Sequence, residues 1–312
     1  MTTQRPMSRS TRPAGGRRRF GAQSAVGPLR RALVRPPCWS PEAAACEDPA
    51  VWKTRWGYTT PPDLGRACEE HAALVDILVR AGVEVEECRS PRDALYDSVF
   101  ACDWGVVTDA GAVVFAPGKE ARQPEADLAE EAFRDAGVPV LHRMRRPATA
   151  EGGDLLWLAP DLLLVGRSYR TNASGLDELR ALLGPLGVTV VPAPVVHGQG
   201  PGSVMHLLSA ISLVDVDLAV AYLPVLAVET VEFLRARGIE FVEVPDEEYP
   251  TLGCNVLALA PRHCVVAAGN PRVRRDLERR GVAVEEFPAR ELGLNMGGGP
   301  TCLVQALLRD YP

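Results

Sequence analysis

Lysine is nearly absent from this sequence, because Lys53 and Lys119 are the only two among 34 basic residues in a chain of 312. The glycine-rich segment "EGGD", which begins at Glu151, has no lysine after it and so lacks the mark of a phosphate-binding loop. A net positive charge is absent too, since the formal charge is -6. Nucleic-acid-binding proteins usually present a basic face. We therefore expect neither a phosphate-binding loop nor a nucleic-acid partner.

Metal-binding and membrane signals are also missing. The eight cysteines occur singly, without CxxC pairs or the CxxC and HxxxH spacing of structural zinc sites. No run of 18 apolar residues is present, so no transmembrane helix is expected. The N-terminus lacks the apolar run of a signal peptide. Because disulfides occur mainly in secreted proteins, none is expected here. These absences predict a cytoplasmic protein with no metal site and no membrane partner.

The first 19 residues differ in composition from the rest. They carry six arginines among Ser, Thr, Pro and Gly, a composition typical of disorder, and we expect a disordered basic tail over 1–19. The chain as a whole is 46% hydrophobic and 24% charged, close to the globular average. Because no internal boundary is evident, residues 20–312 are expected to form a single α/β domain.

One phrase recurs along the chain. It reads "AGVEVEEC" from residue 81, and related versions begin at 136, 186, 237 and 280. A helical pattern of apolar residues precedes each copy, and a Val/Ile-rich strand pattern follows it. A glycine between the two is typical of a left-handed helix cap. The cap positions are Gly82, Gly137, Gly187, Gly238 and Gly281.

Five copies of helix, glycine and strand at a period of about 50 residues indicate five similar modules. Short apolar runs such as "AVVFAP" and "LLLVGR" supply further strands. We predict an α/β fold, a pseudo-fivefold α/β propeller; an ordinary doubly wound sheet is the alternative, because helix, glycine and strand also recur there. Helix starts are predicted at Asp63, at Ser174 with Asp177 as a capping box, and at Asn270 before Pro271.

Two acidic segments could hold a cation. In "DSVFACD", Asp97 and Asp103 are six residues apart, so on an extended segment both carboxylates would lie on the same side. In "EGGDLLWL", Glu151 and Asp154 flank two glycines, which allow the backbone to approach a ligand closely. Each segment could equally be a turn with solvated acids, and the residues alone leave both interpretations open.

Two other segments carry a base and a thiol. His206 stands among apolar residues in "SVMHLLSAISLVD", as either a core histidine or a catalyst. The segment "GGGPTC" ends at Cys302, which we predict to lie in the first turn of a helix "CLVQALLRD". A cysteine at a helix start has a lowered pKa, because the free N–H groups and the helix dipole favour the thiolate. A buried cysteine after a flexible loop is the alternative.

Together the four segments supply a thiol, an imidazole and several carboxylates without metal-ligand spacing. Such a set can hold a planar cation while the thiol attacks its central carbon. Guanidinium fits this description, since its N–H groups pair with carboxylates that hold and orient the carbon. The residues therefore favour a small guanidino compound as the substrate.

These segments, with "GRSYRTN" between them, resemble in order and spacing the guanidine-modifying superfamily of arginine deiminases, dimethylarginine dimethylaminohydrolases and arginine:glycine amidinotransferases. The resemblance extends from about residue 19 to the C-terminus and implies the same propeller. It implies that Cys302 is the nucleophile that forms a covalent thiouronium and that His206 is the general acid and base. Glu151 and Asp103 would hold the guanidinium.

The same resemblance implies roles for four other polar residues. Asp97 and Arg122 would contact the amino-acid end of the substrate. Arg170, in "GRSYRTN", would bind the substrate carboxylate, while Asp154 would order its loop.

Two positions depart from the pattern of the superfamily. Arginine deiminases and amidinotransferases typically carry His-x-Asp, whereas Leu208 stands two residues after His206 here. The dimethylarginine hydrolases also lack that acid, which favours an N-alkylated guanidine. Those hydrolases often have Glu before the aspartate of the first motif, whereas Cys102 precedes Asp103 here.

The resulting hypothesis is a hydrolase of dimethylarginine type that releases an alkylamine, leaves citrulline and uses no metal or organic cofactor. Two enzyme alternatives stay open, an amidinotransferase and an enzyme of arginine deiminase type on another guanidino substrate. A non-catalytic binder of arginine analogues is the third alternative. The oligomeric state is open, with a homodimer as the form considered.

Overall fold

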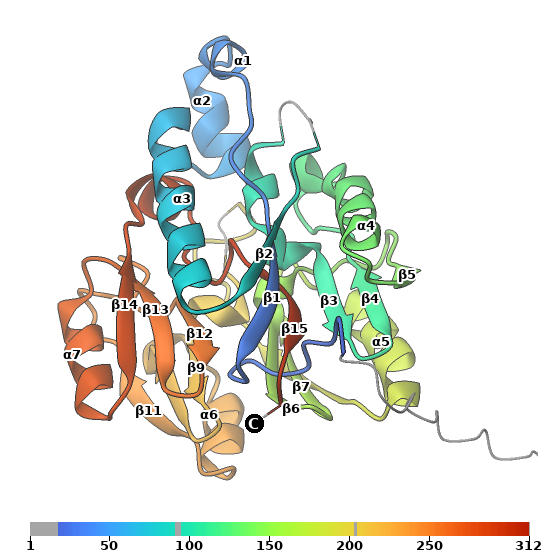
Figure 1. Cartoon of the computed structure of the whole chain (residues 1–312), viewed down its shortest axis with the longest axis vertical. Helices are drawn as coiled ribbons and strands as arrows, with labels where there is room; N and C mark the ends of the chain where they lie inside the picture. Colours follow the sequence, from blue (N-terminus) through green and yellow to red (C-terminus); the bar gives the residue numbers. More distant parts are fainter. Residues whose placement is uncertain (1–17, 91–94, 203–204, 312) are drawn as a thin grey trace, which may run out of the picture.

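The computed structural model describes residues 18–90, 95–202 and 205–311. Within this part of the chain lie five three-stranded sheets, and the helices lie on the outside of the molecule (Figure 1). Residues 1–17 of the expected tail lie outside the described part. Arg18, near the end of the expected tail, donates to Asp109 at 2.7 Å and lies 4.3 Å from the centre of the Tyr311 ring. This last part of the expected tail therefore packs against the domain.

The second module shows the plan that the five modules share. Strands β3 (Gly105–Thr108) and β4 (Gly111–Val114) form an antiparallel pair. Helix α4 (Glu125–Asp135) then crosses to β5 (Val140–Arg143), which runs parallel to β4. Both strands of the pair are buried along their whole length, so each presents apolar side chains on both faces.

The next three modules repeat this order of two strands, one helix and one strand. The third consists of β6 (Leu155–Ala159), β7 (Leu162–Arg167), α5 (Ala173–Leu183) and β8 (Thr189–Pro194). The fourth consists of β9 (Ile211–Asp215), β10 (Leu218–Ala221), α6 (Val228–Arg235) and β11 (Glu240–Glu243). The fifth consists of β12 (Val256–Ala260), β13 (His263–Ala267), α7 (Pro271–Arg279) and β14 (Ala283–Phe287).

The first module is completed by the C-terminal strand. β1 (Leu29–Val34) pairs parallel with β2 (Glu84–Glu87) across α3 (Leu64–Arg80), and antiparallel with β15 (Gln305–Arg309). The prediction of a helix over "CLVQALLRD" is therefore wrong. A short apolar run does not distinguish a helix from a buried strand, and here the vacant edge of β1 provides the partner for a strand.

The glycines of the repeat have the predicted conformation. Each of the five follows its helix with a φ between 71° and 84°, a region that glycine adopts without the penalty of a Cβ. The predicted helix start at Asp63 is confirmed, since its carboxylate accepts from the Arg66 amide at 3.0 Å. The capping box of Ser174 and Asp177 is wrong, because α5 begins after Asn172, whose side chain accepts from the Gly175 amide at 2.8 Å.

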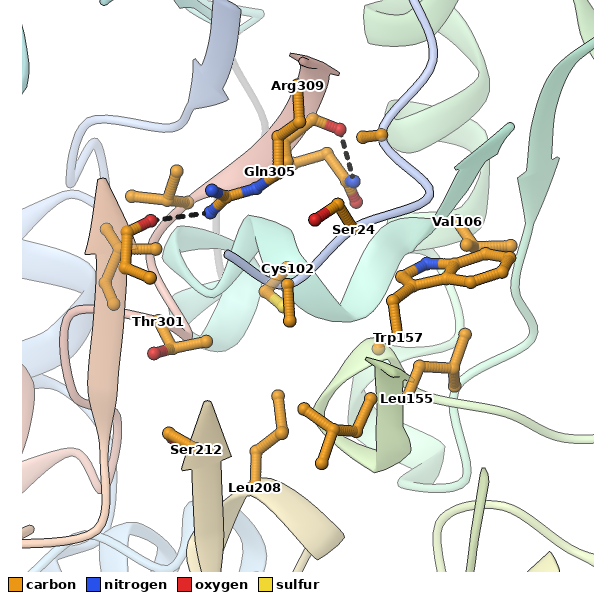
Figure 2. Close-up of a pocket in the computed structure, with 18 of the residues that line it drawn as sticks. Ser24, Cys102, Val106, Leu155, Trp157, Leu208, Ser212, Thr301, Gln305 and Arg309 are labelled. Carbon is orange, nitrogen blue, oxygen red and sulfur yellow. Dashed lines mark hydrogen bonds between the residues drawn. The ribbon is translucent and has the colours of Figure 1, made fainter. Parts of the chain in front are cut away.

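The first strands of the five modules surround a central cavity. Residues of β3, β6, β9, β12 and β15 all contribute to its wall, and Figure 2 shows side chains from several of them pointing into it. The predicted pseudo-fivefold α/β propeller is thus confirmed, and the doubly wound alternative is excluded.

Between β1 and α3 the chain adds a small helical segment and an aromatic cluster. It contains α1 (Pro41–Ala45), α2 (Pro49–Val51) and the π-helical turn η1 (Trp52–Trp56). Trp52 stacks on Tyr58 with ring centres 6.0 Å apart, and Trp56 meets Tyr96 edge-on at 5.0 Å. Trp56, at the end of this segment, lies in the wall of the pocket that contains predicted site residues.

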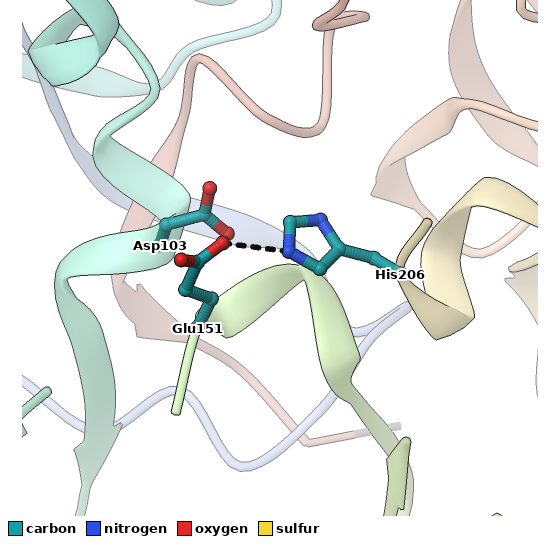
Figure 3. A group of neighbouring side chains, drawn as sticks. All are labelled: Asp103, Glu151 and His206. Atoms are coloured by element: carbon teal, nitrogen blue, oxygen red, sulfur yellow. Dashed lines mark hydrogen bonds and ion pairs between the residues drawn. The ribbon is translucent and has the colours of Figure 1, made fainter. Parts of the chain in front are cut away.

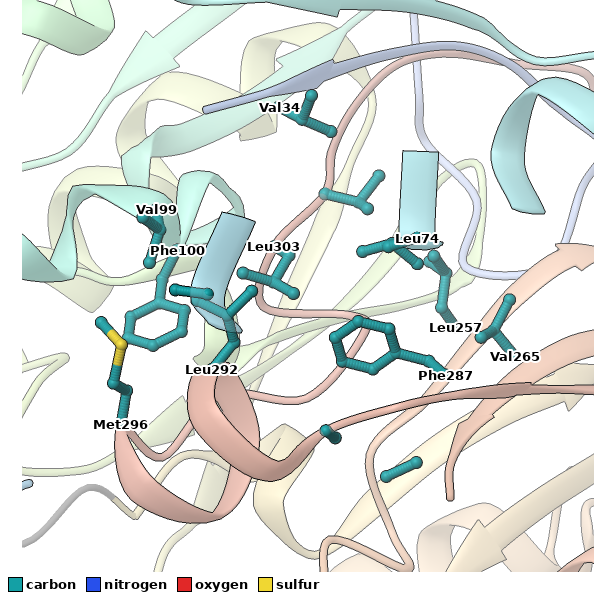
Figure 4. Packing of buried hydrophobic residues seen from close by; sticks show 14 of the residues in the cluster. Val34, Leu74, Val99, Phe100, Leu257, Val265, Phe287, Leu292, Met296 and Leu303 are labelled. Atoms are coloured by element: carbon teal, nitrogen blue, oxygen red, sulfur yellow. The ribbon is translucent and has the colours of Figure 1, made fainter. Parts of the chain in front are cut away.

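A hydrophobic cluster links the first and fifth modules to the loop before Cys302. Phe287 and Leu257 of the fifth module pack in the same cluster as Leu74 of α3 (Figure 4). Leu292 and Met296, in and just after η9 (Arg290–Asn295), extend it toward the site. The loop that carries the predicted nucleophile therefore rests on a packed core. Within the described residues, no helix combines the length and the apolar character needed to cross a membrane.

Candidate active site

The predicted catalytic residues occupy equivalent places in different modules. Asp103 lies in η3 (Ala101–Trp104) directly before β3, Glu151 precedes η5 (Gly152–Asp154) and β6, and His206 precedes η7 (Leu207–Ser209) and β9. Asn255 directly precedes β12, and Cys302 comes shortly before β15. The first strands of the modules surround one axis, and each of these five residues precedes such a strand. The five side chains therefore lie together at one end of the axis.

One pocket at this end of the axis collects most of the predicted residues. The predicted residues among its walls are Asp97, Asp103, Arg122, Arg170, His206 and Cys302. Trp56, Phe100 and the segment 296–298 complete the wall. A thiol, an imidazole, two carboxylates and two guanidinium groups thus face one space.

The glycines of "GGGPTC" allow close packing of the loop. A Cβ on Gly298 would come within 2.2 Å of the Phe100 ring, and one on Gly299 would come within 2.4 Å of Asn255. Gly297 has a φ of 91°. These three residues therefore fix the path of the chain into Cys302, rather than simply leaving room for a ligand.

The environment of Cys302 differs from the prediction of a helix terminus. Between Cys302 and residue 311, where the described part ends, the chain forms no helix, so no helix dipole lowers the pKa of Cys302. Burial first, and the carboxylate of Asp103 second, raise the pKa of the Cys302 thiol to about 11. Asn255 Nδ2 donates to Sγ at 3.2 Å, which partly offsets this rise. The thiol is therefore neutral in the ligand-free enzyme at pH 7.

His206 is held by a buried carboxylate. Its Nε2 lies 2.8 Å from Glu151 Oε2, as the dashed line in Figure 3 shows. Burial lowers the pKa of His206, but the surrounding carboxylates, Asp103 foremost, outweigh burial and raise it to about 9. The imidazole is therefore protonated at pH 7.

Glu151 lies behind His206 and does not form part of the pocket wall. Its side chain is completely buried. Oε1 accepts from the Gly118 amide at 2.9 Å, and Arg170 Nη1 lies 3.3 Å from Oε2. Despite burial, Arg170 and His206 hold the pKa of Glu151 well below its usual value. In this geometry the carboxylate of Glu151 pairs with His206 and Arg170. Its contact with a guanidinium stays a prediction.

Asp103 is a pocket carboxylate that raises the pKa of both Cys302 and His206. Oδ1 accepts from the Gly153 amide at 2.8 Å, and Oδ2 accepts from Arg122 Nη1 at 2.6 Å. Glu125, which the sequence analysis did not single out, binds the rest of Arg122 through Nε at 3.0 Å and Nη2 at 2.9 Å. Arg122 therefore orients Asp103, and its own donors are largely occupied.

The donor atoms of Asp103, Glu151 and His206 lie within 4.8 Å of one another, a separation that a metal ion could bridge. Both carboxylates already have guanidinium partners in Arg122 and Arg170. His206, with a pKa of about 9, carries a proton instead of a free lone pair at pH 7. This donor set fits a network of ion pairs better than a metal site.

Asp97, in the wall of the pocket, has partners that its sequence motif did not predict. Asp97 Oδ1 accepts from the Tyr58 hydroxyl at 2.7 Å, and Oδ2 pairs with Lys119. Lys119 also donates to the Trp56 carbonyl at 2.7 Å. Asp97 therefore lines the pocket with both of its oxygens engaged.

Three further residues of the sequence motifs, Asp154, Leu208 and Cys102, lie outside the wall of this pocket. Asp154 accepts from the Ser168 hydroxyl at 2.6 Å and from the Leu207 amide at 2.9 Å, which orders the loop beside His206. Leu208 is buried in the apolar cluster of the third and fourth modules. Cys102 points into the central cavity (Figure 2).

A five-module α/β propeller with a thiol, a protonated histidine and a carboxylate at one end defines a guanidine-modifying enzyme of the amidinotransferase superfamily. Comparison of sequences narrows this class. The family model described as "N,N dimethylarginine dimethylhydrolase, eukaryotic" matches residues 53–309. The chain belongs to the dimethylarginine dimethylaminohydrolase family.

A curated relative agrees with this assignment, and solved structures share the fold. A dimethylarginine dimethylaminohydrolase of Streptomyces coelicolor is 34% identical over 289 residues, which are 91% of this chain and 99% of the relative. An arginine deiminase of Mycobacterium marinum is 32% identical over only 53% of this chain and 48% of its own length. The Pseudomonas aeruginosa dimethylarginine dimethylaminohydrolase, solved as a mutant with citrulline, has the same fold, with a TM-score of 0.71, 23% identity and coverage of 89% and 98% of the two chains.

Proposed function

We propose that this protein hydrolyses N-methylated arginines to citrulline and an alkylamine through a covalent intermediate on Cys302. The observation that carries the proposal is the convergence of the Cys302 thiol, protonated His206 and Asp103 on one pocket. The 34% identity to the Streptomyces coelicolor dimethylarginine dimethylaminohydrolase over nearly the whole chain supports it.

The substrate itself activates the nucleophile. The Cys302 thiol has a pKa of about 11, and a guanidinium cation next to it lowers that pKa because opposite charges favour the thiolate. Asp103 accepts the guanidinium N–H groups through its remaining lone pairs. The thiol proton leaves to solvent as the cation binds, while Asn255 stabilises the sulfur through its hydrogen bond.

The thiolate then attacks the central guanidino carbon and forms a tetrahedral adduct. The bond from this carbon to the alkylated nitrogen breaks, and the nitrogen keeps the electron pair. His206, protonated at pH 7, gives its proton to that nitrogen, so that an amine leaves. A thiouronium remains on Cys302.

Hydrolysis completes the cycle. Neutral His206 takes a proton from water, and the water oxygen attacks the thiouronium carbon. The carbon–sulfur bond breaks, citrulline is released and the thiolate is restored. Glu151 holds the imidazole through both steps, since its oxygen lies 2.8 Å from Nε2.

The residues around His206 favour an alkylated over an unsubstituted guanidine. Leu208 is 7% exposed and packs among apolar side chains at the position where His-x-Asp enzymes carry an acid. Leu208 therefore offers no carboxylate to accept the N–H groups of an unsubstituted leaving nitrogen.

Product analysis tests the proposal. Reduced protein is incubated separately with asymmetric dimethylarginine, monomethylarginine and arginine, and the products are identified by mass spectrometry. We expect citrulline from the two methylated substrates only, and none with Cys302→Ser of unchanged circular dichroism. Citrulline and ammonia from arginine would indicate a deiminase instead. A new guanidine formed only when an acceptor amine is added would indicate amidino transfer.

The ligand and the oligomeric state of the enzyme stay predictions. A guanidino small molecule is the expected ligand, and a homodimer is a separate prediction that light scattering of the purified chain tests. The single domain over 20–312 likewise stays a proposal, supported by the five modules and by the closure of the first one through β15.

A further inference from the structure

The central cavity of Figure 2 contains one buried cation. The cavity has a volume of about 110 Å³, and Arg309, the last residue of β15, lies in its wall and is only 4% exposed. Arg309 Nη1 donates to the Gly27 carbonyl at 2.7 Å, and Nη2 donates to the Ala258 carbonyl of β12 at 2.8 Å. The guanidinium therefore joins the segment before β1 to the fifth module.

No carboxylate balances this charge within the described residues. The wall of the cavity contains neither Asp nor Glu among them. Burial lowers the pKa of Arg309 to about 10, so the guanidinium is still charged at pH 7. Burial also raises the pKa of Cys102, in the same wall, well above its usual value, so this thiol is neutral. A buried charge is costly unless an opposite charge pairs with it, and the wall of the cavity therefore favours an anion.

Two hydroxyl groups in the same wall can donate to an anion. Ser24 Oγ accepts from the amides of Val26 at 3.2 Å and Gly27 at 2.8 Å, which leaves its hydroxyl proton for another acceptor. The Thr301 hydroxyl is buried and has no hydrogen-bond partner in the described part of the chain. Buried polar groups are normally hydrogen-bonded. An unpartnered hydroxyl in the wall that carries Arg309 is therefore a second, independent indication of a ligand that accepts hydrogen bonds.

The other polar atoms of the wall fit an anion that has water beside it. The Cys102 thiol points into the cavity and is a weak donor. Gln305 Nε2 donates to the Ala306 carbonyl at 3.1 Å, while Gln305 Oε1 is buried and has no partner among the residues described. A water can donate to this oxygen and to the anion at the same time. One water needs roughly 10–15 Å³, so the cavity has room for a small anion and several waters.

Charge and size limit the class of anion. One guanidinium balances one negative charge, and the rest of the wall is largely apolar, with Leu155, Trp157 and Val256 among its side chains. A divalent anion would keep one charge uncompensated in these surroundings. The proposed nucleophile and the proposed general acid do not line this cavity, so the site is separate from the proposed reaction.

We propose that the central cavity binds one small monovalent anion, such as chloride or nitrate, at Arg309, Ser24 and Thr301. Arg309 also holds carbonyls of the segment before β1 and of β12, and its amide donates to the Gly21 carbonyl at 2.9 Å. Because these contacts close the ring of modules, an anion that neutralises Arg309 stabilises the closed propeller. A ligand that binds only the folded state raises the free energy of unfolding as its concentration rises.

Thermal unfolding of the full chain tests the anion site. Chloride replaces gluconate, a larger organic anion, at constant ionic strength, and the unfolding midpoint is followed by circular dichroism. Once the site is saturated, each tenfold rise in chloride concentration should raise the midpoint by about 2–4 °C. A midpoint that does not depend on the chloride concentration would overturn the proposal.

Two arginine variants separate the site from a general effect of salt. Arg309→Gln removes the buried charge, so most of the chloride dependence should be lost. The control, Arg30→Gln, removes an exposed arginine on β1 that pairs with Asp310, the neighbour of Arg309, and should keep the dependence of the wild type. An equal chloride dependence in both variants would contradict the proposal.

Anomalous diffraction locates the anion even if Arg309→Gln fails to fold. Crystals of the wild-type protein grown in sodium bromide should show bromide in the central cavity, within hydrogen-bond distance of Arg309 and of Ser24 or Thr301. Water alone in the cavity, with bromide at surface positions as an adventitious ion only, would overturn the proposal. Either result leaves the proposed function unaffected, because the anion site contains none of the proposed catalytic residues.

Discussion

Replacing Glu151 with Gln tests how the enzyme keeps His206, the proposed general acid, protonated. Glu151 is completely buried, and its oxygen lies 2.8 Å from Nε2 of His206. Glutamine keeps the shape of the side chain but removes its negative charge. The protonated imidazole then loses its nearest charged partner, while Asp103 and Asp154 still favour the proton.

The size of the effect follows from the contact that is lost. A hydrogen bond to a charged group contributes about 1.5–3 kcal/mol, and one pKa unit corresponds to about 1.4 kcal/mol. The pKa of His206, about 9 in the wild type, should therefore fall by about one to two units. The raised pKa stabilises the fold fully below pH 6.5, its ordinary value, and this stabilisation is lost as the pH rises through about 9. The variant should lose it at a lower pH.

The assay is an NMR titration of the histidine Cε1–H resonances. The chain has only five histidines, and the resonance absent from His206→Ala identifies the one of interest. The alkaline limb of kcat against pH should shift by the same amount, because the leaving amine needs the protonated form. A His206 pKa that stays near 9 in Glu151→Gln would refute the assignment of Glu151 as the residue that positions and charges the imidazole.

Three other substitutions probe the site. Asn255→Ala removes the hydrogen bond to Cys302 Sγ, so kcat/KM should fall about ten- to hundredfold, measured from citrulline formation. Gly298→Ala places a methyl against the Phe100 ring and should lower the free energy of unfolding by about 1–3 kcal/mol in a urea titration. Arg170→Lys should raise KM about tenfold or more with a smaller change in kcat, because the planar fork that faces the pocket is lost; an unchanged KM would place the substrate carboxylate elsewhere.

The repeat was the part of the fold that the sequence could predict. A glycine at a φ near 80° follows every module helix, and few residues other than glycine adopt that conformation readily. The last segment could not be predicted in the same way. "CLVQALLRD" forms a strand because β1, whose paired residues lie about 270 to 280 positions earlier (Leu29 with Arg309, Leu33 with Gln305), offers an edge for pairing. A pairing over that distance leaves no local signal.

The candidate site was only partly accessible to sequence reasoning. The order of the motifs predicted that Cys302, His206 and Asp103 belong to one site, and these three residues line one pocket. Asn255 was missed, because a single asparagine carries little signal, although it precedes β12 as the other site residues precede their strands. Lys119 was missed because its partner Asp97 is brought to it by a tertiary contact. Glu125 could have been found, since it pairs with Arg122 only three residues before it. The pKa of Cys302 was predicted in the wrong direction, since burial acts on it instead of a helix terminus.

The covalent intermediate is the central claim, and intact-mass spectrometry tests it most directly. The reduced enzyme is mixed with asymmetric dimethylarginine, quenched in acid within the first turnovers, and weighed, and a digest locates any adduct. The mechanism predicts an increase equal to the substrate less dimethylamine, on Cys302 alone, that disappears as citrulline forms. Citrulline production without an adduct, together with retained activity in Cys302→Ser, would contradict the account.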